Sequence, residues 1–170
     1  TWPIAQAPAH WGRVDNGDGP LNIWSVNSVG SHLLTDPLRV ADANIFYPER
    51  RSLAFSEMLL VQGAVAAPAI ALGAPPVLAF NVAVLSGFTL TGWAFCLLVR
   101  AWTGSWLSGL AAGSLAAFNA HTLVRIAHVQ TLHVEFLPLA LFALDRVVTT
   151  PRGDLRNSTI RLPSRWLAAL

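Results

Sequence analysis

The sequence has little charge, a single cysteine and no lysine, and each of these shortages narrows what the chain can be. Charged residues make up 12% of the 170 residues, whereas a soluble domain typically has about 25%. The one cysteine, Cys96, lies within an apolar run, so no disulfide or cysteine metal site can form inside the chain. With 54% hydrophobic residues and a mean hydropathy of +0.50, the composition favours an integral membrane protein.

Several familiar functional signatures are missing as well. The sequence contains no Walker loop, no GxSxG, no HExxH and no dinucleotide-binding fingerprint. All eleven basic residues are arginines, but they form no patch with interleaved aromatic residues, so we expect no nucleic-acid partner. The chain starts at Thr1 without a first apolar helix and ends on RWLAAL, the apparent opening of another one. We therefore expect a fragment of a longer multi-pass protein.

Three apolar stretches are candidate membrane-spanning helices. Residues 77–99 carry no charge and would extend roughly 34 Å as a helix, enough for a bilayer core of about 30 Å. In residues 105–120, Gly109 and Gly113 form a GxxxG pair, and Ser105 and Ala117 extend this small face. Such a face predicts close packing against another helix. Residues 134–148 are the third candidate.

Residues 58–72 are shorter and are interrupted by Gln62 and Pro68, which favours an interfacial or re-entrant helix over a span. Five arginines between 146 and 165 predict a cytoplasmic loop there. Counting back through three spans places the N-terminal region outside. If residues 58–72 also span, that region lies inside. The expected organisation is an external acidic loop with juxtamembrane helices (1–56), an interfacial helix (57–73), three transmembrane helices (77–150), and a cytoplasmic loop with the start of the next helix (151–170).

The acidic N-terminal region offers the first candidate site. Six of the nine acidic residues lie between positions 15 and 57. Asp15 and Asp18 flank Asn16-Gly17, and the glycines at 17 and 19 would let the backbone turn so that both carboxylates point into one cleft. The simpler alternative is a solvated turn. The pattern does not fit an EF-hand, because its third and fifth positions are glycines.

A second candidate site lies between the last two apolar stretches. His121, Arg125 and His128 are spaced i, i+4 and i+7, which places them on one face of a predicted helix. An arginine between two imidazoles suits a phosphate better than zinc. The alternative is that these side chains reach toward the membrane surface or cap a helix. Ser56 and Glu57 could cap the helix that follows them, and Glu57 is also a candidate substrate-binding residue.

The order of these parts resembles the N-terminal region of bacterial GT-C-type membrane glycosyltransferases. The resemblance is carried by DNGDGPLNIW, DPLRVADANIFYPERRSLAFSE, NVAVLSGFTLTGWAFCLLVRAWTG and HTLVRIAHVQTLHVEFLPLALFAL, which together cover most of the chain. It implies an all-α integral membrane fold, namely an external loop with in-plane helices followed by three transmembrane helices of a larger bundle. It also implies a location in the bacterial inner membrane.

What this resemblance implies for function is sugar transfer from a polyprenyl-phosphate donor to a lipid or glycan acceptor. Asp15 or Asp18 would match the catalytic base, and Arg125, His128, His121 and Glu57 would contact substrate. A divalent metal at Asp15 and Asp18 is compatible with the resemblance but not required by it. Two alternatives remain open. The chain could belong to a transporter or flippase whose His121–Arg125–His128 face lines a path, or it could be a non-catalytic membrane scaffold.

Overall fold

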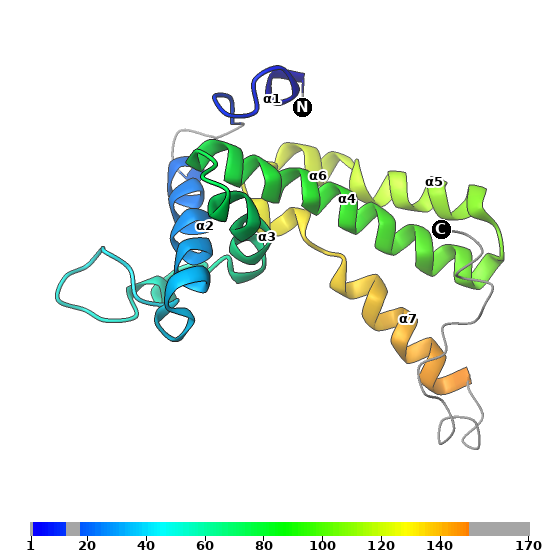
Figure 1. Ribbon diagram of the computed structural model, residues 1–170. Coiled ribbons are helices and arrows are strands. Elements are labelled where there is room, and N and C mark those ends of the chain that lie inside the picture. Colours follow the sequence, from blue (N-terminus) through cyan, green and yellow to red (C-terminus); the bar gives the residue numbers. More distant parts are fainter. Residues whose placement is uncertain (1, 13–17, 150–170) are drawn as a thin grey trace.

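The computed structural model describes residues 2–12 and 18–149, and this part of the chain consists of helices and their connections (Figure 1). The α-helices are α1 (Trp2–Gln6), α2 (Asp18–Thr35), α3 (Leu60–Ala71), α4 (Pro76–Thr103), α5 (Trp106–Ala117), α6 (Ala120–Val124) and α7 (Phe136–Thr149). Short 3-10 helices occur at Pro37–Arg39, Ser52–Phe55 and Val129–Leu132. No strand occurs among the described residues, so the predicted all-α class is confirmed. The predicted cytoplasmic loop at 151–170 lies outside them.

Helix α4 is the longest element, and the other helices are arranged around it. Its 28 residues make it the one described helix that is long and apolar enough to cross a membrane. Pro76 occupies its first turn, where a proline costs no hydrogen bond. The helix continues past the predicted end at Val99 and stops at Gly104, which adopts a left-handed conformation with φ of 72°. Arg100 lies in the last turn, with its guanidinium 3.5 Å from the centre of the Trp106 ring.

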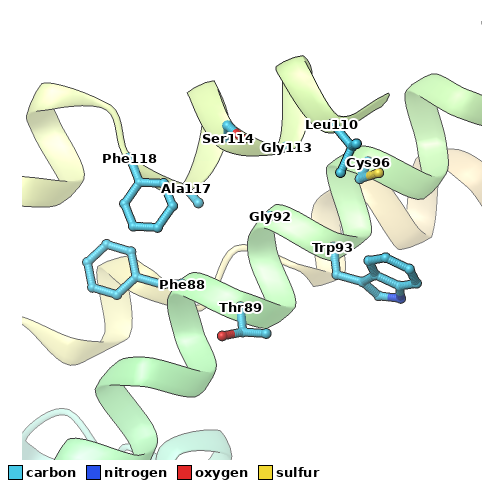
Figure 2. Close-up of a pocket in the computed structure, with 10 residues that line it drawn as sticks. All are labelled: Phe88, Thr89, Gly92, Trp93, Cys96, Leu110, Gly113, Ser114, Ala117 and Phe118. Atoms are coloured by element: carbon cyan, nitrogen blue, oxygen red, sulfur yellow. The ribbon is translucent and has the colours of Figure 1, made fainter. Parts of the chain in front are cut away.

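Helix α5 packs along α4, as the small-residue face predicted (Figures 1 and 2). A Cβ on Gly109 would lie 2.6 Å from the carbonyl oxygen of Cys96, and a Cβ on Gly113 would overlap the carbonyl oxygen of Gly92. Ser105 is not part of this face. It caps α5 by accepting a hydrogen bond from the Ser108 N–H at 3.3 Å. The GxxxG prediction is thus confirmed for both of its glycines.

Helices α2 and α3 pack against each other and lie across the N-terminal end of α4 (Figure 1). The predicted short helix at 58–72 is confirmed as α3, which has 12 residues. Helices were expected within residues 1–56, but the bounds of α2 were not predicted, because residues 18–35 were assigned to the acidic loop. Two glycines bring α2 and α3 together: a Cβ on Gly63 would lie 2.7 Å from Cβ of Val29, and a Cβ on Gly30 would lie 3.0 Å from the Gly63 carbonyl oxygen.

The apolar core lies where α2, α3, α4 and the segment after α6 meet. Its buried members come from these elements, from the N-cap of α3 and from the end of α5: Val26, Leu59, Ala66, Ala79, Phe80, Ala83, Val84, Phe88, Ala117, Ile126, Val129 and Leu132. Beside it, α4, α5 and Phe118 line an open apolar hollow of about 330 Å³ (Figure 2). At one end of this hollow, the rings of Phe88 and Phe118 stack with their centroids 5.4 Å apart.

The second and third predicted spans correspond to α5 and α7. These helices have 12 and 14 described residues, roughly 18 Å and 21 Å at the α-helical rise. Helix α7 diverges from the other helices, and Pro138 is its one buried residue (Figure 1). Within the described residues only α4 has the length of a span, so the arrangement of three transmembrane helices stays a prediction.

Candidate functional site

The polar segment between α5 and α7 turns sharply and does not form one helix. Asn119 caps α6 by accepting a hydrogen bond from the Thr122 N–H at 2.9 Å. The helix ends at Val124 and Arg125 follows as its C-cap, after which the His128 N–H bonds to the Arg125 carbonyl oxygen at 2.9 Å. The prediction that His121, Arg125 and His128 share one helical face is therefore wrong. His121 and Arg125 are exposed, whereas His128 is half-buried.

This turn brings together two of the predicted site residues. Asp18, the first residue of α2, has its Oδ2 3.7 Å from Nδ1 of His128. One helical turn further along α2, the buried Asn22 donates a hydrogen bond to the Ala127 carbonyl oxygen at 3.0 Å. This second contact fixes the position of residues 125–128 relative to the start of α2. The side chain of Asp18 remains 59% exposed and that of His128 31% exposed, so both are accessible to a ligand.

Glu57 contacts the same polar segment. Its Oε2 accepts a hydrogen bond from Nε2 of Gln130. It does not cap α3 as the sequence suggested, because the N-cap is Leu59, in a left-handed conformation with φ of 46° and with no side-chain capping bond. The Oε1 atom of Gln130 is buried and has no hydrogen-bond partner among the described residues. Glu57 thus contacts the segment that carries His128, two residues further along the chain at Gln130.

The structure says less about the remaining predicted site residues, Asp15, His121 and Arg125. Asp15 lies outside the described residues, so its proposed pairing with Asp18 and their shared metal stay predictions. Within the described part of the chain, no three His, Cys, Asp or Glu side chains gather where they could hold a metal ion. Neither His121 nor Arg125 makes a side-chain hydrogen bond or ion pair with a described residue.

A buried polar cluster lies further along this segment, against α4, and the sequence assigned it no role. His133 has Nε2 3.0 Å from the Ala83 carbonyl oxygen and Nδ1 2.9 Å from Oε1 of Glu135. Thr91 donates to the Leu132 carbonyl oxygen at 2.7 Å and accepts from the Val134 N–H at 3.1 Å. Gly87 leaves the space for the His133 ring, since a Cβ there would lie 3.1 Å from it. The only signal in the sequence was two ionisable residues beside an apolar helix.

Comparison with known proteins gives this chain no family. No family model, curated protein or solved structure matches it. Its function must therefore be argued from its own residues, and the Asp18–His128 contact is the arrangement with the clearest chemical use. An exposed carboxylate can accept a proton, and a neighbouring imidazole can orient that carboxylate or share the proton.

Proposed function

We propose that this chain is part of a membrane glycosyltransferase of the bacterial inner membrane, which moves a sugar from a polyprenyl-phosphate donor to a lipid or glycan acceptor at the external face. The observation that carries the proposal is the contact between Asp18 and His128, 3.7 Å apart although separated by more than a hundred positions. It supplies a proton acceptor in an accessible position at the start of α2.

Exposed apolar side chains support a membrane location. Large apolar residues with at least a third of their surface exposed follow one another along α4, α5 and α7: Leu85, Leu90, Trp93, Trp102, Leu107, Leu110, Leu115, Leu137, Leu139, Leu141, Leu144, Val147 and Val148. Apolar surface exposed along three helices is unfavourable in water and favours a membrane or protein interface. If α4 crosses the bilayer, α2 and α3 lie across its N-terminal end, as in-plane helices would.

The chemistry follows from the charges in the site. Asp18 takes the proton of the acceptor hydroxyl while the hydroxyl oxygen attacks the anomeric carbon of the donor sugar. The bond from that carbon to the lipid phosphate breaks, and the phosphate leaves with the bonding electrons. Arg125 lies three residues before His128 and makes no side-chain bond to the described residues, so its guanidinium can receive the developing charge. His128 keeps the Asp18 carboxylate in position.

Substitution of Asp18 tests this proposal in the full-length protein. Asp18→Asn keeps the size and polarity of the side chain but cannot accept the proton, so turnover should fall by a factor of about 10² or more, while donor binding persists. Asp145→Asn on α7 is the matched control and should leave turnover unchanged. Turnover is measured in proteoliposomes with a radiolabelled polyprenyl-phosphate sugar. Equal activity of the two variants would reject Asp18 as the base.

The alternative of a transporter or flippase is favoured by one observation, the buried His133–Glu135 pair against α4. Ionisable pairs at membrane depth commonly mark proton or substrate paths. The two functions are separated by two assays, each made on full-length protein of verified folding. Glu135→Gln in the full-length protein should abolish transport of a labelled substrate across vesicles if the pair is part of a path. In a transferase, Asp18→Asn should be the variant that abolishes product formation.

A further inference from the structure

The outward face of α2 forms one wall of a polar pocket that is separate from the Asp18–His128 contact. Trp24, Asn27, Ser28, Ser31 and His32 are spaced i, i+3, i+4, i+7 and i+8, so they share one side of the helix. The segment that follows α2, coloured cyan in Figure 1, supplies the facing wall. The pocket has a volume of about 590 Å³, within the range of roughly 300–1,000 Å³ typical of small-molecule sites.

The hydrogen bonds of the pocket leave several polar atoms available. Both N–H groups of the Asn27 amide are used, since Nδ2 donates to the carbonyl oxygens of Ile23 at 2.8 Å and Pro76 at 3.0 Å. Its Oδ1 therefore remains as an acceptor. His32 has Nδ1 2.8 Å from the Ser28 carbonyl oxygen. Because a carbonyl can only accept, Nδ1 carries the hydrogen and Nε2 of the neutral ring is left to accept.

The charges that line the pocket cancel. Arg39 donates from Nε to Oδ2 of Asp42 at 3.1 Å, and the Arg51 N–H donates to Oδ1 of the same carboxylate at 3.0 Å. These two hydrogen bonds, that from Arg39 first, lower the pKa of Asp42, so the carboxylate stays ionised at neutral pH. The other nitrogens of Arg39 have no partner among the described residues and remain as donors. An anionic ligand would face Asp42, and a cationic one would face Arg39.

We propose that this pocket binds a neutral saccharide. A sugar carries hydroxyl groups that donate and accept, which match the Asn27 and His32 acceptors and the Arg39 donors. It also has a C–H face that can lie on the apolar face of an indole such as that of Trp24.

This inference does not depend on the proposed transfer reaction. Helix α2 rises about 1.5 Å per residue, which places Trp24 roughly 9 Å and His32 roughly 21 Å along the axis from Asp18. Binding at the pocket can therefore be measured without donor, acceptor or turnover. A chain with no transferase activity could still bind saccharide here, and an active transferase could lack this site.

Saturation-transfer NMR on the protein in nanodiscs tests the proposal directly. The probes are maltose, lactose and cellobiose as neutral disaccharides, with glucose 6-phosphate as the anionic comparison. At least one disaccharide should bind at about 10 mM, which saturates a site with a Kd near 1 mM. Trp24→Ala should weaken that binding by about tenfold or more, whereas Trp102→Ala, at an exposed tryptophan near the end of α4, should not.

A pocket-filling variant separates a loss of binding from a loss of folding. Ser31 is exposed and its side chain makes no hydrogen bond to the described residues, so Ser31→Trp can occupy the pocket without breaking a contact. It should abolish saccharide binding while the circular dichroism spectrum stays that of the wild type. The proposal is overturned if none of the three disaccharides binds, if glucose 6-phosphate binds more tightly than all of them, or if saccharide binding survives Ser31→Trp.

Discussion

His133 forms a buried pair with Glu135 and also makes a hydrogen bond to the backbone of α4. Their side chains are 1% and 7% exposed, and Nδ1 of His133 lies 2.9 Å from Oε1 of Glu135. Nε2 must carry a hydrogen, because the Ala83 carbonyl oxygen 3.0 Å away can only accept one. A second hydrogen lies between Nδ1 and Oε1. Both ring nitrogens of His133 therefore have a hydrogen-bond partner within the core.

Removing one member of this pair should be strongly destabilising. Glu135→Ala leaves the buried Nδ1 of His133 without its partner, and breaking a buried ion pair in this way costs about 3–5 kcal/mol. The measurement is the free energy of unfolding in mixed micelles of detergent and denaturant. Glu49→Ala removes an exposed carboxylate and should change stability by less than about 0.5 kcal/mol.

The double variant His133→Leu/Glu135→Leu removes the polar contact of the pair but keeps most of its side-chain volume. Because both polar groups are replaced by apolar side chains of similar volume, most of the lost stability should return. A Glu135→Ala variant as stable as Glu49→Ala would show that the pair contributes nothing to the fold. A double variant less stable than Glu135→Ala would show that the unpaired His133 is not the cause of the loss.

The contact between α4 and α5 depends on Gly113. Alanine at this position would gain up to about 1 kcal/mol of helix propensity, but its Cβ would overlap the Gly92 carbonyl oxygen of α4. Because backbone atoms cannot move aside locally, the helices must separate, and we expect Gly113→Ala to lose about 1–3 kcal/mol in the same unfolding measurement. Ser114→Ala, at the adjacent exposed position, should be neutral or stabilising. A stabilising Gly113→Ala would show that the helices are not in close contact.

The elements that the sequence predicted well are those whose signal is local. Helix α4 follows from an uninterrupted apolar run, and its contact with α5 follows from the spacing of Gly109 and Gly113. The bounds of α2 were not predicted, because its buried face is made largely of small and polar residues. Asn22, Ser25 and Gly30 are buried there, and these residues favour turns and caps when judged from sequence alone.

The candidate site could be predicted only in part, because its contacts are not local. Asp18 and His128 were each singled out, but nothing in either neighbourhood indicates that α2 and the segment after α6 meet. The prediction that His121, Arg125 and His128 share a helical face is wrong for the same reason. Asn22 and Asp18 hold residues 127 and 128 in a turn through contacts made from across the fold, and these contacts replace the helical continuation that the spacing suggested.

The topology of the chain can be tested with one cysteine before α3 and one at the end of α4. Helix α3 has 12 residues, roughly 18 Å in length, too short for a bilayer core of about 30 Å. Single cysteines at Leu38, which is 96% exposed, and at Thr103 should therefore react with an impermeant maleimide from opposite sides, in a Cys96→Ala background. We expect Leu38→Cys to react in intact cells. Reaction of both cysteines from the same side would mean that α3 also crosses the membrane.

Arg125 provides a test of the phosphate site that rests on the proposed function. Its side chain is exposed and makes no hydrogen bond or ion pair with a described residue, and an arginine beside a membrane is costly unless it meets water or an anion. Arg125→Lys keeps the charge but loses the planar, two-pronged donor, so affinity for polyprenyl phosphate should fall, and Arg125→Leu should lower it further. Affinity is measured on full-length protein with verified folding, with Arg146→Leu on α7 as the control. If Arg125→Leu binds the lipid phosphate as tightly as the control does, Arg125 is an interfacial anchor and the phosphate binds elsewhere.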